Sequence, residues 1–471
     1  MKPRILLLTC PYYYLDNSPV EYLVPAHLLQ LGSFLRDRGY YAELYDVLVQ
    51  FGIQHDEADL RHYRRKVAIA LSALEGDYDL IGISCYTSFQ YQASLDLAEV
   101  CRSVFPNTTI VVGGYHPTAV PTDFIFPGSA IDCVVKGEGE NALLAILNAL
   151  ESGDRIPQII AAPVIFDVNE LPELDFTLIE DWSRYDYYYD YFSRGCPFSC
   201  RFCMEAVKEE RRWRPLDPKR AVSRLRAAVD RLGDELLAKK GLVMLNDAIF
   251  GLKKSWVREV LEQLTGCFPH LQFFASPRVD VLDKDLLRRF QAAGFSIDIP
   301  VEHGAPAQLE RMAKTTRPAV FLEHTEKLLA HAHNIGLPHH THWVMGHPGE
   351  TCETLKTCRE YMQRVHESND YGMTEIFYFK LYPGSWLEQN WATVADSWGA
   401  QIDIPEYWKQ RASLDEVPYH IRPSTVLSRQ DVIEWVENEM LPLGKSLNVS
   451  ARIHHERCCG TLRTENAPWI L

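Results

Sequence analysis

Three cysteines near the centre of the chain are spaced to bind metal through sulfur. Cys196, Cys200 and Cys203 follow a C-x3-C-x2-C pattern on one short segment. Three thiolates can hold three irons of a 4Fe-4S cluster and leave the fourth iron open to another ligand. Zinc would normally take a fourth cysteine or histidine at a matching spacing, and none follows within the next thirty residues. The segment therefore predicts a 4Fe-4S cluster.

The composition is that of an ordinary globular protein and limits the classes of partner. The length of 471 residues predicts two or three domains. The chain is 46% hydrophobic and 24% charged, and no apolar run in its sequence is long enough to span a bilayer. The 48 basic and 63 acidic residues give a formal charge of -15, which opposes tight binding to nucleic acid. The basic, then apolar N-terminus lacks a cleavage site and indicates a buried strand. We expect a cytoplasmic protein with a small-molecule partner, no nucleic acid and no membrane.

The other cysteines show no disulfide pattern. Of the twelve cysteines, nine are scattered along the chain, which fits a reducing compartment. Most of the scattered ones lie in apolar segments and are expected to be small core residues. Cys458 and Cys459 are adjacent near the C-terminus and could be redox-active or bind metal, so their role stays open.

The first third of the chain alternates short apolar runs with amphipathic segments. Strands are expected at residues 5–9, 42–45, 80–84, 109–113 and 131–136. Helices are expected at residues 25–38, 57–74, 91–105 and 140–150. This alternation predicts an α/β domain at residues 1–150 with a parallel, doubly wound, Rossmann-like sheet. Such a sheet binds ligands in the loops beyond the carboxyl ends of its strands.

Two glycine-rich turns follow the fourth and fifth expected strands. Gly113-Gly114-Tyr115-His116-Pro117 and Gly137-Glu138-Gly139-Glu140 let the backbone approach a bulky ligand. No G-x-G-x-x-G follows the first strand, which argues against a nicotinamide dinucleotide. The turns, and roughly residues 4 to 150 with them, resemble the cobalamin-binding domain found N-terminal to many radical S-adenosylmethionine (SAM) enzymes.

That resemblance implies a cobalamin site formed by the loops at the carboxyl ends of the strands. The implied contacts are Pro11, Tyr12, Ser84, Tyr86, Thr87, Gly113, Gly114, Tyr115, His116, Pro117, Gly137, Glu138, Gly139 and Glu140. For His116 a purely structural role in the loop is the open alternative.

The segment after the second expected strand bears on cobalt coordination. Cobalamin proteins that ligate cobalt through a histidine carry D-x-H-x-x-G, whereas this segment reads Asp46-Val47-Leu48-Val49-Gln50-Phe51-Gly52. Leu48 occupies the place of that histidine. The resemblance therefore implies a base-off cofactor without histidine coordination, whose apolar lower face favours reduction to cobalt(I). A nitrogen ligand on cobalt in the electronic spectrum would contradict this hypothesis.

The central part of the chain is expected to be a linker followed by a barrel. Residues 151–186 contain prolines and acids without periodicity, as a linker does. Tyrosines at 185, 187–189 and 191 then form either a strand with alternating faces or the lining of a cavity between cofactors. Further strands are expected at 241–247, 272–276, 296–300, 339–345 and 372–378. With intervening helices they predict a partial (βα)6 barrel at residues 187–385.

The barrel motifs are similar to those of the radical SAM superfamily. The cysteine loop follows the first expected strand, and similar motifs follow the next four: Asn246-Asp247-x-x-Phe250, Ser276-x-Arg278-Val279-Asp280, Val301-Glu302-His303-Gly304 and Gly346-His347-Pro348-Gly349-Glu350-Thr351. This resemblance implies that the open iron binds the amino and carboxylate groups of SAM. The implied SAM contacts are Phe202, Asp247, Ser276, Arg278, Glu302 and Met345. Arg278 and Glu302 could equally form a structural ion pair.

Histidines gather near the fourth and fifth barrel strands. His303 replaces the serine of the family's Glu-Ser-Gly motif, and His340 and His342 share one face of a strand because they are two residues apart. If they point inward with His303, they could orient a substrate carboxylate or exchange a proton near neutral pH. Ordinary packing and metal binding are the alternatives, and their roles stay open.

The C-terminal segment, residues 386–471, is expected to form a mainly helical lid over the barrel. It is rich in tryptophan, and residues 429–440 have the pattern of an amphipathic helix. Such a lid would define the substrate pocket. The segment resembles no known motif, so the sequence does not identify the substrate.

Taken together, the resemblance implies a cobalamin-dependent radical SAM methyltransferase whose cofactors are a 4Fe-4S cluster, SAM and cobalamin. Such an enzyme moves a methyl group from SAM via methylcobalamin to a carbon of a natural-product or amino-acid-like molecule. Its electrons would come from a donor such as flavodoxin or ferredoxin. A non-methylating rearrangement or cyclisation is the alternative reaction. A non-catalytic cobalamin or redox sensor is an alternative of another class, although a sensor needs no open iron.

Overall fold

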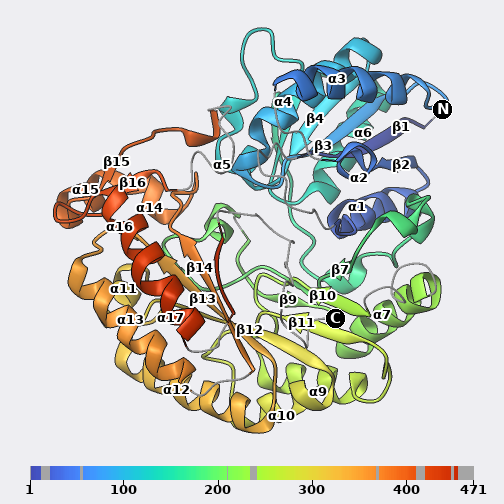
Figure 1. Ribbon diagram of the computed structural model, residues 1–471. Helices are drawn as coiled ribbons and strands as arrows, with labels where there is room; N and C mark the ends of the chain where they lie inside the picture. Colours follow the sequence, from blue (N-terminus) through green and yellow to red (C-terminus); the bar gives the residue numbers. More distant parts are fainter. Residues whose placement is uncertain are drawn as a thin grey trace.

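Two parallel β-sheets, one after the other along the chain, form the framework of the protein (Figure 1). The computed structural model describes residues 2–11, 22–52, 57–208, 210–233, 241–367, 371–409, 419–446 and 450–454. Figure 1 shows the first sheet and its helices, in blue and cyan, above the arc of green-to-orange strands that forms the second. The expected α/β class, with a doubly wound domain followed by a partial barrel, is confirmed.

The first sheet has the strand order β2-β1-β3-β4-β5-β6, and all neighbours are parallel. Its strands are β1 (Arg4–Thr9), β2 (Tyr41–Tyr45), β3 (Leu80–Ser84), β4 (Thr109–Gly113), β5 (Cys133–Lys136) and β6 (Ile159–Ala161). Its helices are α1 (Ala26–Asp37), α2 (Val47–Phe51), α3 (Glu57–Ser72), α4 (Tyr91–Val104), α5 (Tyr115–Ala119) and α6 (Gly139–Ser152). Strand β1 is apolar on both faces because Ile5 and Leu7 pack into one core and Leu6 and Leu8 into another.

The second sheet has the order β17-β14-β13-β12-β11-β10-β7, again parallel throughout. Its strands are β7 (Tyr188–Asp190), β10 (Leu242–Leu245), β11 (Gln272–Ala275), β12 (Phe295–Glu302), β13 (His339–Met345), β14 (Gly372–Tyr378) and β17 (Ser450–His454). The helices that follow them along the outer side of the arc in Figure 1 are α7 (Pro218–Leu232), α9 (Lys254–Leu264), α10 (Lys284–Ala292), α11 (Pro306–Arg311), α12 (Pro318–Ile335) and α13 (Cys352–His366).

The C-terminal segment, which was expected to be mainly helical, contains both helices and short strands. It contains α14 (Trp386–Gln389), α15 (Trp391–Trp398), α16 (Arg429–Trp435), a π-helical turn at Val436–Met440 and α17 (Leu441–Ser446), with a small antiparallel pair of β15 (Gln401–Ile402) and β16 (Ile421–Arg422). Short 3-10 turns occur at Ser88–Gln90, Pro121–Asp123, Val168–Glu170, Phe176–Leu178, Trp182–Arg184, Met204–Val207 and Tyr407–Lys409. None of the helices in the described ranges is both long and apolar enough to cross a membrane.

Two strands of the large parallel sheets lie where the sequence predicted none. Strand β6 falls in the segment expected to be a linker, yet it extends the first sheet beside β5. Strand β17 falls in the segment expected to form a helical lid, yet it pairs with β14 as the seventh strand of the barrel sheet. Both are short edge strands, whose few residues carry too little periodicity to be recognised in a sequence.

A buried ion pair fixes the first barrel strand. The carboxylate of Asp190 accepts hydrogen bonds from Nε and Nη2 of Arg224 at 2.8 and 2.6 Å. The hydroxyl of Tyr188 donates to the same carboxylate at 2.8 Å, and Arg224 also donates to Gln30 of α1. Since both charged side chains are almost fully buried, the pair joins β7, α7 and the first domain at one point.

Replacing Asp190 with alanine should destabilise the fold strongly, because it leaves Arg224 as an uncompensated buried cation. The expected loss is roughly 3–5 kcal/mol of unfolding free energy, measured by denaturant unfolding of the cofactor-free protein. Glu323→Ala, which removes an exposed partner of Lys327, is the control and should leave the midpoint unchanged. Equal midpoints for the two variants would contradict this role of Asp190.

Candidate functional site

The three clustered cysteines lie on a loop closed by a short hairpin. Strand β8 (Ser193–Arg194) pairs antiparallel with β9 (Arg214–Pro215) and brackets the loop. Gly195 has a φ of 80°, and a Cβ there would lie 2.3 Å from the carbonyl oxygen of Arg212, so the hairpin requires glycine. The three thiols are partly exposed and free of disulfide bonds.

These thiols suit an iron–sulfur cluster. Burial raises the pKa of the Cys196 thiol and raises that of Cys203 to about 12, so a bound metal must supply the charge that keeps them as thiolates. Within the described ranges, no three His, Cys, Asp or Glu side chains surround one point as ligands of a single metal ion. Each cysteine of a 4Fe-4S site binds a different iron, so these cysteines need not converge on one point.

Arg278, one of the expected SAM contacts, lies against the cysteine loop. Its Nη1 atom is 3.5 Å from Sγ of Cys200, and its guanidinium group lies 3.6 Å from the centroid of the Phe198 ring. Asp280 accepts a hydrogen bond from its Nε at 3.0 Å and holds the side chain in place. A fixed positive charge therefore adjoins the thiolate position, where it can also receive a ligand carboxylate.

Glu302 and Lys314 form a second charged pair close to Arg278. Glu302 ends β12 with a φ of 70°, a strained conformation for a residue other than glycine, and its carboxylate is 2.8 Å from Nζ of Lys314. Arg278 donates to the Lys314 carbonyl oxygen at 2.8 Å. The direct Arg278–Glu302 ion pair left open by the sequence is thus absent, and Lys314, which the sequence did not single out, connects the two residues.

The other expected SAM contacts also lie at or near the carboxyl ends of barrel strands. Ser276 follows β11, Met345 ends β13 and is buried, and Phe202 lies half-buried in the cysteine loop. Asp247 follows β10 and accepts hydrogen bonds from the Ser193 hydroxyl and from the Phe192 amide at 3.2 Å. Burial raises the Asp247 pKa to about 7. Asp247 therefore anchors the strand that leads into the cysteine loop, and a contact with SAM stays a prediction.

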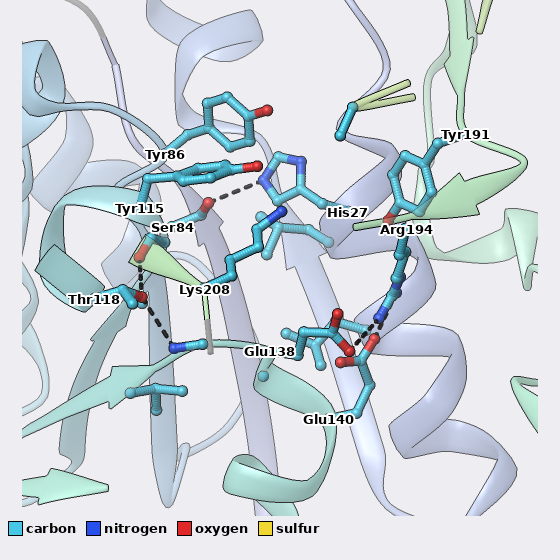
Figure 2. Close-up of a pocket in the computed structure, with 18 of the residues that line it drawn as sticks. His27, Ser84, Tyr86, Tyr115, Thr118, Glu138, Glu140, Tyr191, Arg194 and Lys208 are labelled. Carbon is cyan, nitrogen blue, oxygen red and sulfur yellow. Dashed lines mark hydrogen bonds and ion pairs between the residues drawn. The ribbon is translucent and has the colours of Figure 1, made fainter. Parts of the chain in front are cut away.

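A cavity of about 360 Å³ opens at the carboxyl ends of β3, β4 and β5 (Figure 2). Residues of both domains line it. Those expected to contact cobalamin are Ser84, Tyr86, Gly113, Gly114, Tyr115, Gly137, Glu138, Gly139 and Glu140. Those supplied by the barrel domain include Tyr189, Tyr191, Ser193, Arg194, Lys208, Asn246 and Asp247. Two tyrosines of the aromatic run therefore line the cavity, which was one of the two interpretations of that run.

Some expected cobalamin contacts do not line this cavity. Pro11, Thr87 and Pro117 lie outside its wall, and Tyr12 lies outside the described residues. His116 is buried within the first domain, where Nδ1 is 2.9 Å from the Ser88 hydroxyl and Nε2 is 3.4 Å from the Asp123 carboxylate. Helix α5 begins at Tyr115, which turns the next side chain inward. The structural alternative for His116 therefore fits the geometry, and burial lowers its pKa.

The two expected glutamates point toward arginines of the cysteine hairpin. Arg194 lies 2.7 Å from Glu140 and 3.3 Å from Glu138, and Arg214 also pairs with Glu138. All four side chains are at most 14% exposed. Arg194 and Arg214 are paired residues of β8 and β9, so one hairpin presents both cations to the turn after β5. The glutamates thus bind the barrel domain, while Gly137 and Gly139 of the same turn line the cavity.

Several residues that line the cavity were not singled out from the sequence, and His27 and Lys208 are two of them. His27 is the second residue of α1, and Lys208 follows the cysteine loop, where its ammonium lies 2.9 Å from Glu205 and 4.4 Å from the centroid of the Tyr115 ring. Figure 2 shows His27, Tyr86, Tyr115 and Lys208 grouped on one side of the cavity, opposite Glu138, Glu140 and Arg194. Neither residue belongs to a recognisable motif, so only the folded chain reveals them.

The barrel histidines do not converge. His342 lies between Asp298 of β12 and Glu375 of β14, at 3.3 and 2.7 Å, and these carboxylates raise its pKa to about 9 against the effect of burial. His340 packs edge-on against Phe274. His303 instead pairs with Glu350 at 3.2 Å and accepts a hydrogen bond from the Ala305 amide at 3.0 Å. Because both nitrogens of His342 already face carboxylates, a substrate carboxylate is a poor partner for it.

Cys458 and Cys459 lie outside the described residues.

The cavity has features that suit cobalamin. Apolar side chains from the sheet and from helices α1 and α6 form its wall, among them Leu7, Leu28, Leu31, Val111 and Leu143. Gly137 has a φ of 79°, and a Cβ there would meet no other atom within 4 Å, so this turn presents bare backbone to open space. An apolar wall with a few polar groups at the rim is typical of cofactor sites.

Comparisons with known proteins agree with this architecture. Residues 19–147 match the B12 binding domain family, and residues 191–362 match the radical SAM superfamily. An uncharacterized methyltransferase of Pyrococcus horikoshii is 24% identical over 330 residues, which cover 66% of this chain and 69% of that protein. The anaerobic magnesium-protoporphyrin IX monomethyl ester cyclase of Rubrivivax gelatinosus is 25% identical over 362 residues, covering 70% of this chain and 60% of the cyclase.

A solved structure shares the fold over most of the chain. It is the radical SAM methyltransferase TsrM from Kitasatospora setae with cobalamin and a [4Fe-4S] cluster bound. The TM-score is 0.64 at 16% identity, covering 88% of this chain and 78% of TsrM. The same enzyme has also been solved with tryptophan as substrate and a SAM analogue. With a B12 binding domain joined to a radical SAM barrel, this chain belongs to the cobalamin-dependent radical SAM enzymes, whose cofactors are a 4Fe-4S cluster, SAM and cobalamin.

Proposed function

We propose that the protein is a methyltransferase that transfers a methyl group from SAM, by way of cobalamin, to a carbon atom of a small molecule. One observation carries the proposal: a single cavity is lined both by the turns expected to hold cobalamin and by the hairpin of the cysteine loop. Reaction between groups on two cofactors needs them to face a common space, because proximity and orientation supply much of the rate enhancement. The similarity to TsrM and to the P. horikoshii methyltransferase supports the same reaction class.

The chain's own residues would bind, orient and shield the reactants. Arg278, which lies beside Cys200, would receive the carboxylate of SAM, and Glu302, which Lys314 holds in position, would contact other polar groups of SAM. Tyr189 and Tyr191 cover the side of the cavity nearest the barrel and help to exclude water. When bound, the cluster supplies the electron that cleaves SAM and cobalamin supplies the methyl carrier. We further propose a small electron donor protein, such as flavodoxin or ferredoxin, as partner.

The domain limits expected from the sequence remain proposals for the functional units. Residues 1–150 would bind cobalamin, residues 187–385 the cluster and SAM, and residues 386–471 would close the substrate pocket, with 151–186 between the first two. The pairing of β6 with β5 and of β17 with β14 means that each flanking segment also stabilises a neighbouring sheet. Truncation at these limits would therefore remove sheet strands.

A second candidate reaction is a rearrangement or ring closure without methyl transfer. The observation that favours it is the similarity to the R. gelatinosus cyclase, which extends over 70% of this chain. Both reactions would use the same two cofactor sites, so the products distinguish them.

Anaerobic turnover of the reconstituted holoenzyme with SAM and candidate small molecules tests the proposal. The expected products are S-adenosylhomocysteine, 5'-deoxyadenosine and a substrate heavier by one methyl group, followed by mass spectrometry. Enzyme lacking added cobalamin is the control and should yield no methylated product. Formation of 5'-deoxyadenosine with a rearranged but unmethylated product would support the second candidate instead.

Replacing Arg194 with methionine should weaken the junction between the two cofactor sites. It leaves the buried carboxylate of Glu140 without its partner, so cobalamin affinity should fall by about tenfold or more in a spectroscopic titration. Arg212→Met is the matched control because the Arg212 side chain is 68% exposed and pairs only with Glu210 among described acids. Equal cobalamin affinity in the two variants would show that the junction does not support the site.

Replacing Cys200 with alanine should separate the functions of the two domains. The variant should lose iron content and SAM cleavage because one cluster ligand is missing, yet it should bind cobalamin like the wild type. Cys267→Ala, which changes an exposed thiol on the surface, should affect neither property. Loss of cobalamin binding as complete as the loss of iron would refute independent sites.

A further inference from the structure

His27 is held in the cobalamin cavity by one hydrogen bond. It lies in the first turn of α1, and its Nε2 atom is 2.9 Å from the hydroxyl of Ser84 at the end of β3 (Figure 2). The ring also packs against Tyr86, with 5.8 Å between ring centroids. Both contacts come from the end of β3 and the segment directly after it, so the imidazole of α1 has a fixed orientation at the edge where the strands end.

The second nitrogen of His27 is available to a ligand. Nδ1 has no hydrogen-bond partner among the described residues, and the side chain lines the cavity. Burial without a nearby carboxylate lowers the pKa of His27 to about 4, so the imidazole is neutral near pH 7. A neutral imidazole nitrogen is a good ligand for a transition metal, and a ligating histidine commonly donates its other N–H to a neighbouring acceptor. Ser84 provides that acceptor.

The other polar groups of the described cavity wall are less suited to bind a metal. Lys208 is paired with Glu205, and Glu138 and Glu140 are paired with arginines. His27 is the only histidine in the described lining, which contains no cysteine. The wall therefore offers one neutral nitrogen donor.

We propose that Nδ1 of His27 ligates the cobalt of bound cobalamin, with Ser84 holding the ring in position. This inference rests on the assignment of cobalamin to the cavity and concerns the cofactor site alone. It revises the expectation drawn from Leu48, because Leu48 belongs to α2 and does not line the cavity. The group that faces cobalt therefore comes from the helix after β1 instead of the segment after β2.

Electron paramagnetic resonance of the cobalamin-loaded protein, reduced to cobalt(II), tests the ligand directly. A coordinated nitrogen splits the cobalt lines into triplets when it is nitrogen-14 and into doublets when it is nitrogen-15. Protein labelled with nitrogen-15 histidine and loaded with unlabelled cobalamin should show doublets, whereas unlabelled protein should show triplets. His27→Phe should abolish the splitting, and His62→Phe, at an exposed position on α3, should preserve it.

Two outcomes would overturn the proposal. Triplets that persist in the nitrogen-15 protein would assign the ligand to the cofactor's own base, and the absence of any splitting would mean that no nitrogen is bound. The labelling experiment uses wild-type protein, so it decides the question even if His27→Phe folds poorly. Because it requires no SAM and no turnover, its result is independent of whether methyl transfer occurs.

Discussion

The buried ion network of Arg194, Arg214, Glu138 and Glu140 joins the first domain to the hairpin that carries the cysteine loop. The carboxylates stand on the turn after β5, and the guanidinium groups stand on the hairpin that leads to the cysteines. A buried charge that loses its partner is costly, so the domains cannot separate here without leaving charges unpaired. The turn that presents its backbone to the cavity is thereby fixed relative to the loop that presents thiols.

The topology of the two sheets brings the loops of both domains to this junction. Both sheets are parallel, so each collects its loops at the carboxyl ends of its strands. Tyr189 and Asn246 of the barrel line the same cavity as Ser84 and Tyr115 of the first sheet, which shows that the two carboxyl edges meet. The Asp190–Arg224 pair joins β7 to α7, and Arg224 also donates a hydrogen bond to Gln30 of α1. It is therefore a second buried polar contact between the two domains.

The sequence predicted the elements whose signal is local. The cysteine spacing, the glycine turns and the apolar runs of the central strands each depend on few neighbours, and the α/β architecture follows from them. Features that depend on distant partners were not predictable: β6 and β17 gain their stability from strand pairing, and Glu138 and Glu140 meet arginines more than fifty residues away. His116 was an expected cobalamin contact because it belongs to a recognisable motif, but its side chain is buried within the first domain. His27 lines the cavity and belongs to no such motif.

The proposed function requires the 4Fe-4S cluster and cobalamin to face each other across the cavity that Arg194 lines. Pulsed electron paramagnetic resonance on protein loaded with cobalt(II) cobalamin and the reduced cluster tests it most directly. The structure predicts a dipolar coupling between the two paramagnetic centres that is absent when only one cofactor is loaded. Two uncoupled signals from fully loaded protein would contradict the shared site.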